Sequence, residues 1–215
     1  MHAQVFNKIQ ADQASEICRD IDIDSAARDM LVTDISPPSF LGSLIDRSLY
    51  PDAVKFLARA LPPREATWWA YVCVRSILDC DTSQSVMAAM STVERWVYEK
   101  TEEGRRAAYV AAQVTNFNHP ASWVAMAAFW SGGSMSPVDA PVVPPARNLS
   151  GKAAAGAIML ATVLDKPEKA PEKYRLFLES GIDIANSGNG GNLQRQGPFI
   201  RQHPDGTFYL DKQVT

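Results

Sequence analysis

Apolar residues recur at intervals of three and four along most of this 215-residue sequence, and prolines stand at the borders between such windows. This spacing gathers the apolar side chains on one face of an α-helix. Proline fits the first turn of a helix, where its missing N–H is not needed, but it breaks a helix interior. In Leu61-Pro62-Pro63 one window ends and the next begins. The pattern therefore predicts consecutive helices, and with them an all-α fold.

The helical windows are separated by short connections. Asp81 or Thr82 is expected to cap the third helix, and Thr101 precedes the fourth. Shorter helices are expected within 11–18, 25–31 and 40–47. Helices joined in this way pack as antiparallel neighbours, so we expect an irregular antiparallel bundle or a solenoid-like stack. The main windows are 51–61, 63–79, 86–97, 107–114, 121–130, 149–164 and 171–185.

The composition divides the chain into three parts. Residues 1–48 form an acidic segment with short helices, since positions 1–36 alone hold three basic and seven acidic residues, a net charge of −4. Residues 49–186 form the helical core. Residues 187–215 are a flexible linker and tail, in which the glycine-rich stretch 187–192 precedes no helix and a short hairpin carries Phe208 and Tyr209. A lone hairpin is marginal in water, so the tail docks on its own domain or on another chain.

A proline-rich connection runs from Ser134 to Asn148 and is expected to be extended. Because proline segments are already ordered, they lose little entropy when they dock on a surface. Pro141 and Pro144 are therefore candidate binding residues. The alternative is that the segment only clamps the helices of its own domain.

Several classes of protein are excluded by composition. The formal net charge is −3 with no basic stripe, which argues against nucleic acid as a partner. No stretch offers about 20 consecutive apolar residues, so no membrane span is expected. The first 20 residues lack the apolar core of a signal peptide, and the three cysteines form no C-x-x-C pair. These features predict a cytoplasmic protein.

Motifs for metals and cofactors are incomplete. Asp20, Asp22 and Asp24 resemble the start of a calcium loop, but Ser25 and Leu31 replace the required Gly and Glu. Gly151-Lys152 lacks the other residues of a phosphate-binding loop. The histidines, at positions 2, 119 and 203, have no zinc-ligand spacing. We therefore expect no metal and no cofactor.

The segment from Leu61 to Ala70 concentrates the residues that are typical of binding sites. Arg64 gains nothing at a helix N-terminus, so it requires a carboxylate, a carbonyl or the Trp68 ring as a partner. Neighbouring tryptophans point about 100° apart on a helix. Either both are core, or Trp69 is core and Trp68 lines a groove with Arg64 and Glu65.

Four stretches carry a resemblance to known proteins: Leu61-Pro62-x-Arg64-Glu65-Ala66-x-Trp68-Trp69-Ala70, Phe129–Met135, Pro141–Pro145 and Arg175–Ala185. In them the chain resembles a bacterial helical family known as a domain of unknown function, which is associated with type VI secretion gene clusters. The resemblance covers about residues 50–186. It implies a cytoplasmic accessory role with another protein as partner, such as a secreted effector or a secretion component. It brings no catalytic residues.

Two functions are consistent with these features. The first is a non-enzymatic protein-interaction module, an adaptor or chaperone-like accessory protein of a bacterial secretion system. Its candidate binding residues are Arg64, Glu65, Trp68, Pro141, Pro144, Phe208 and Tyr209. The alternative is a small hydrolase or toxin-like effector that uses Arg64, Glu65 and His119. The alternative requires these three side chains to share one pocket.

Overall fold

The computed structural model describes residues 6–164 and 166–211. Within them the regular secondary structure is helical apart from one two-stranded hairpin near the C-terminus. The helices are α1 (Ala14–Cys18), α2 (Ser25–Arg28), α3 (Pro37–Asp46), α4 (Tyr50–Ala60), α5 (Pro63–Arg75), α6 (Gln84–Glu99), α7 (Glu102–Val114), α8 (Pro120–Phe129), α9 (Leu149–Leu164), the short 3-10 helix η1 (Pro167–Lys169), α10 (Ala170–Ala185) and α11 (Gly191–Gln196). The strands are β1 (Phe199–Gln202) and β2 (Phe208–Asp211).

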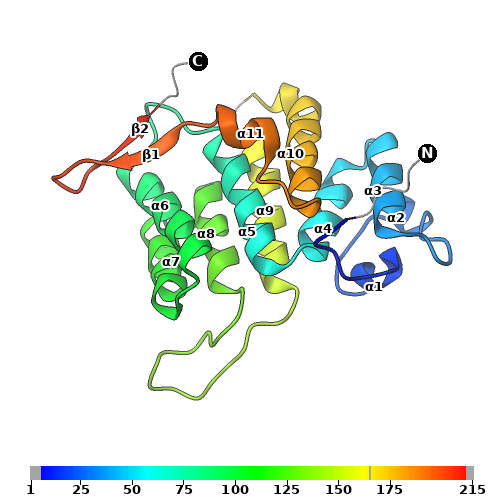
Figure 1. The fold of residues 1–215 in the computed structure, drawn as a ribbon, viewed down its shortest axis with the longest axis horizontal. Coiled ribbons are helices and arrows are strands. Elements are labelled where there is room, and N and C mark those ends of the chain that lie inside the picture. The colour runs from blue at the N-terminus through cyan, green and yellow to red at the C-terminus, as the bar shows by residue number, and fades with distance from the viewer. Residues whose placement is uncertain (1–5, 165, 212–215) are drawn as a thin grey trace.

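Helices α5, α8 and α9 form the centre of an irregular bundle (Figure 1). Helices α6 and α7 pack on one side of this centre, and α4 and α10 pack on the other, with α1 to α3 beyond α4. The all-α fold with a short hairpin tail is confirmed. No helix in the described part of the chain is both long and apolar enough to span a membrane.

Side-chain caps mark the starts of several helices. The hydroxyls of Ser36, Ser83 and Thr101 accept hydrogen bonds from main-chain N–H groups three residues on, at the starts of α3, α6 and α7. The expected cap of α6 at Asp81 or Thr82 is wrong, because the Thr82 hydroxyl accepts from the N–H of Asp79 instead. Helix α5 also ends four residues before its expected end.

Trp69 and Gly181 meet where α5 crosses α10. Trp69 is fully buried, as both interpretations of the Trp68-Trp69 pair predict, and its indole N–H donates to the Phe177 carbonyl at 2.7 Å. A Cβ added to Gly181 would lie only 2.6 Å from the Trp69 ring and 2.7 Å from a Leu57 methyl group. The missing side chain at position 181 therefore makes room for the largest fully buried side chain of the described residues.

The C-terminal segment packs against α5, α6 and α10. Its glycine-rich stretch leads into α11, so the expectation that no helix follows is wrong. Just before this helix, the main-chain N–H of Gly190 donates to the Asp183 carboxylate at 2.9 Å. The predicted hairpin is present, with Ile200 paired to Leu210. The side-chain amide of Gln84 binds both the N–H and the carbonyl of Phe208 at 2.6 Å. Tertiary contacts thus support a hairpin that is too small to stand alone.

Beneath this segment lies a buried cation. Arg75, in the last turn of α5, is fully buried, and its guanidinium donates to the Gln194 carbonyl. The rings of Phe199 and Tyr71 lie 5.0 and 5.5 Å from its guanidinium carbon. Its Nε and Nη1 have no hydrogen-bond partner among the described residues. The segment therefore covers a charge that it compensates only in part.

Candidate functional site

Arg64 connects the start of α5 to the end of α6. Its Nε donates to the Val97 carbonyl at 2.8 Å, and its Nη1 lies 3.6 Å from Glu65. Of the three partners that the sequence leaves open, the structure thus supplies mainly a carbonyl. Carbonyls in the last turn of a helix carry partial negative charge and favour a cation. Because 39% of its side chain remains exposed, Arg64 can still contact a ligand.

Glu65 lies between two cations. Its carboxylate is 3.6 Å from Lys8 and 3.6 Å from Arg64, and its side chain is 16% exposed. Lys8 is held nearby because its main-chain N–H donates to the Ala185 carbonyl at the end of α10. Two cations therefore face one carboxylate, which leaves one positive charge in excess.

Trp68 forms the aromatic wall of the site. Its indole N–H donates to the Asn189 carbonyl at 2.8 Å. Its ring stacks on Tyr71 with a centroid distance of 5.1 Å and meets the edge of Tyr98 at 6.0 Å. Trp68 is half-buried and Trp69 is fully buried, so one tryptophan is core and the other lines a groove.

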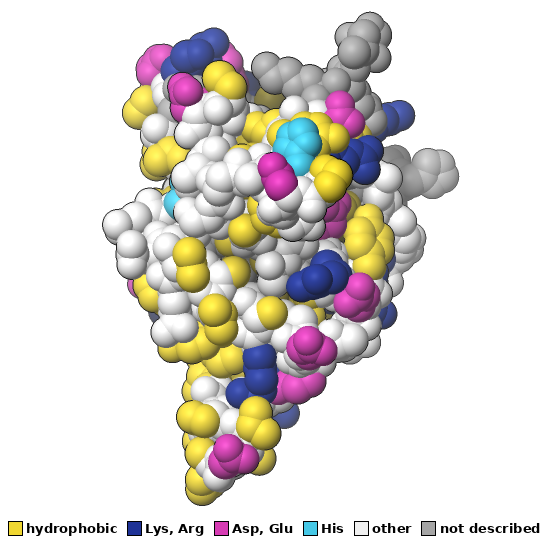
Figure 2. Space-filling view, turned by 90° about the vertical axis from the view of Figure 1, so that its left-hand side faces the viewer, with side chains coloured by type: hydrophobic (Ala, Val, Ile, Leu, Met, Phe, Trp, Pro, Cys, Tyr) yellow, Lys and Arg dark blue, Asp and Glu magenta, His cyan; other side chains and the backbone are white. Residues whose placement is uncertain are grey.

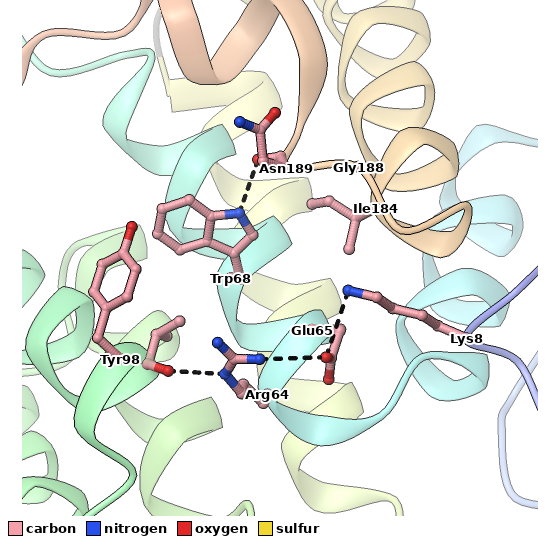
Figure 3. Close-up of a pocket in the computed structure, with 9 residues that line it drawn as sticks. Lys8, Arg64, Glu65, Trp68, Tyr98, Ile184, Gly188 and Asn189 are labelled. Carbon is pink, nitrogen blue, oxygen red and sulfur yellow. Dashed lines mark hydrogen bonds and ion pairs between the residues drawn. The ribbon is translucent and has the colours of Figure 1, made fainter.

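Arg64, Glu65 and Trp68 share one cavity of about 180 Å³ (Figure 3). Tyr98 of α6 stands on one side of them, and Lys8 and Ile184 stand on the other. The remaining lining residues are Val97, Gly188 and Asn189. The sequence signalled only the three residues on α5. The others come from distant segments that no local pattern connects.

The remaining predicted binding residues lie elsewhere. Pro141 and Pro144 are exposed on the loop between α8 and α9, and neither lines this cavity. Phe208 and Tyr209 lie on β2, where Phe208 is half-buried at the start of α6 and Tyr209 is 40% exposed. The sequence-predicted set is thus divided among three places.

His119 caps α8, and its Nδ1 accepts from the N–H of Ala121 at 3.1 Å. Burial lowers the pKa of its imidazole, which favours the neutral form. It is not among the residues that line the cavity with Arg64 and Glu65. His203 packs on the Tyr209 ring, and His2 lies outside the described residues. The three groups of the hydrolase hypothesis are therefore not gathered in this cavity.

Two of the three aspartates that resemble a calcium loop have partners within the chain. Asp20 pairs with Arg59 at 2.8 Å, and the hydrogen bond from that guanidinium lowers the pKa of the carboxyl. Asp24 precedes α2, and the Ser25 hydroxyl donates to its carboxylate. In residues 6–164 and 166–211 no three His, Cys, Asp or Glu side chains are placed to hold a metal ion.

Two of the cysteines are poor nucleophiles. Burial raises the pKa of Cys73 well above its usual range and that of Cys18 to about 11.

At Gly151, a Cβ would lie 2.9 Å from the Ala58 carbonyl oxygen. This glycine therefore permits α9 to approach α4 closely, which accounts for it without a phosphate ligand.

Comparison with known proteins gives one result. A search of curated proteins and a search of solved structures found no match. The model of a family of unknown function (DUF6931) matches residues 40–185, which run from within α3 to the end of α10 and leave out Lys8, Gly188 and Asn189 of the cavity. The match carries no link to type VI secretion. Since it covers well over half of the sequence, the chain belongs to the DUF6931 family of unknown function.

Proposed function

We propose that this chain is a protein-interaction module and that the cavity beside α5 receives side chains of a partner protein. The size of the cavity carries this proposal. At about 180 Å³ it is smaller than the roughly 300–1,000 Å³ that is usual for sites holding whole small molecules. It is large enough for one or two side chains of a docked segment.

The chemistry of the lining describes the partner. Trp, Tyr and Arg are the residues that most often dominate the energy of protein interfaces, and Trp68, Tyr98 and Arg64 border this cavity. Tyr98 is 65% exposed, so its ring is available for contact. The excess positive charge from Lys8 and Arg64 favours an acidic group. The proposed ligand is a segment with an apolar side chain next to an Asp or Glu.

The wider role that we propose is that of a cytoplasmic adaptor or chaperone-like accessory protein. The partner would be a secreted effector or a component of a bacterial secretion system, which is the setting suggested by the resemblance of Leu61–Ala70 and the other motifs. Such a role uses binding without a chemical step.

Photo-crosslinking in the native host tests the proposal. A photoreactive residue at position 98 should capture a specific protein, whereas the same residue at the exposed Val110 of α7 should not. With that partner purified, Tyr98→Ala should weaken binding by at least about tenfold, because truncating an interface hot spot costs about 2 kcal/mol or more and about 1.4 kcal/mol is tenfold. Val110→Ala serves as the matched control. Equal affinity of both variants would refute the proposal.

A further inference from the structure

The connection between α8 and α9 projects away from the helices (Figure 1) and forms a narrow protrusion lined with hydrophobic side chains (Figure 2). Val138 is 78% exposed and Val142 is 76% exposed, the two highest values among the large apolar residues of the described chain. Apolar side chains so exposed on a protrusion are typical of a contact surface.

The base of this loop is fixed. The Ser134 hydroxyl accepts from the N–H groups of Ser136 and Val143 at 3.1 Å, and the N–H of Met135 donates to the Val143 carbonyl at 2.8 Å. From α7, Arg105 and Arg106 donate to the carbonyls of Ser134 and Ser136. A loop that is closed at its neck and rich in proline loses little entropy on docking.

A groove that suits this loop lies beside it. The face between α8 and α9 holds an apolar groove of about 640 Å³, lined mainly by Trp123, Trp130, Met159, Leu160, Val163 and Tyr174. Leu160 and Val163 are each 43% exposed. Aromatic-lined grooves are the usual receptors for extended proline-rich segments.

The charges of loop and groove are complementary. Lys152 lines the groove and is exposed, and Asp139 is exposed in the loop. Neither forms an ion pair with another residue of the described chain. No residue of the loop lines the groove, and Arg105 and Arg106 hold the neck of the loop against α7. Trp130 and Leu149, which flank the loop in sequence, line the groove, so the groove begins where the loop joins α8 and α9.

We propose that the loop 136–145 of one copy docks in the α8–α9 groove of a second copy. A face that carries a protrusion next to a matching hollow is self-complementary, so a two-fold axis forms the contact twice and closes a dimer. Asp139 of each copy then lies near Lys152 of the other. This surface is separate from the cavity beside α5, so its test is independent of the proposed function.

Sedimentation equilibrium of the purified full chain tests the proposal. The wild type should have twice the monomer mass. Val138→Asp/Val142→Asp, which alters the loop, and Leu160→Asp/Val163→Asp, which alters the groove, should each be monomeric. Mixing the two should restore a dimer, because one loop–groove contact remains. Val110→Asp/Val114→Asp, at residues 56% and 62% exposed on α7, is the control and should stay dimeric.

Two results would overturn the proposal. A wild type that remains monomeric at every concentration would assign the loop and the groove to a different protein. A dimer that survives the loop substitutions would arise from another surface. A direct readout is carbodiimide cross-linking of a mixture of light and heavy isotope-labelled chains, which should join Asp139 of one copy to Lys152 of the other and fail in Asp139→Asn.

Discussion

Gly181→Ala puts the packing of α5 on α10 to a quantitative test, because it sets two effects against each other. In a helix interior alanine is more favourable than glycine by about 1 kcal/mol. The new Cβ, however, would lie 2.6 Å from the Trp69 ring and 2.7 Å from Leu57. Overpacking of this kind costs about 1–3 kcal/mol.

The ring cannot move aside without further loss. Its N–H is bound to the Phe177 carbonyl at 2.7 Å, one turn before Gly181 on the same helix. Breaking that buried bond costs about 1–3 kcal/mol more. After the helical gain is subtracted, we expect Gly181→Ala to destabilise the protein by about 1–5 kcal/mol, with a central value of about 3 kcal/mol. For a domain of this size that lowers the Tm by roughly 6–12 °C.

Urea unfolding followed by tryptophan fluorescence provides the measurement, and Gly42→Ala provides the matched control. Gly42 lies inside α3, where an added Cβ meets nothing within 4 Å beyond its own stretch of helix, so its substitution should stabilise the chain by up to about 1 kcal/mol. If both variants are as stable as the wild type or more so, the packing of Trp69 on Gly181 is not as described.

Four further predictions follow from burial and charge. Trp69→Ala should cost about 3–5 kcal/mol in urea unfolding, and a neutral effect would contradict its burial. The hydrogen bond from Arg105 lowers the pKa of Glu102 in the folded protein. The stability from this pair is therefore present above the pKa of the unfolded chain and is lost as the pH falls. Between about pH 6 and about pH 3, the free energy of unfolding should fall more for the wild type than for Glu102→Gln. Deleting 187–215 should lower the Tm and increase binding of an apolar dye, because this segment covers Trp68 and Arg75; an unchanged Tm would disprove its docking. A chelator should leave the Tm unchanged, because the described part of the chain gathers no set of metal ligands, and a reproducible drop would oppose this.

Local patterns predict most of the helices. The bounds of α9 match the expected window 149–164, and Thr101 caps α7, because periodicity and capping depend on residues close in sequence. The start of α11 could not be found in this way, since the Asp183 carboxylate that binds Gly190 lies on another helix. The glycines of 187–192 indicated only a flexible connection.

The candidate cavity was predictable only on one side. Arg64, Glu65 and Trp68 stand together because they share the first turns of α5. Lys8, Tyr98 and Asn189 reach the cavity through the packing of the N-terminal segment, α6 and the C-terminal segment. Their positions depend on tertiary contacts, such as the bond from the Lys8 N–H to the Ala185 carbonyl, that leave no mark in local sequence.

The buried guanidinium of Arg75 affects how readily the C-terminal segment detaches from α5. When the C-terminal segment leaves α5, the contacts with Gln194 and Phe199 are lost, but water reaches Nε and Nη1, which have no partner among the described residues. This hydration offsets part of the lost binding free energy. The segment should therefore detach as a unit while the helices stay folded, and its amide hydrogens should exchange with solvent at a lower free energy than those of α5 and α9.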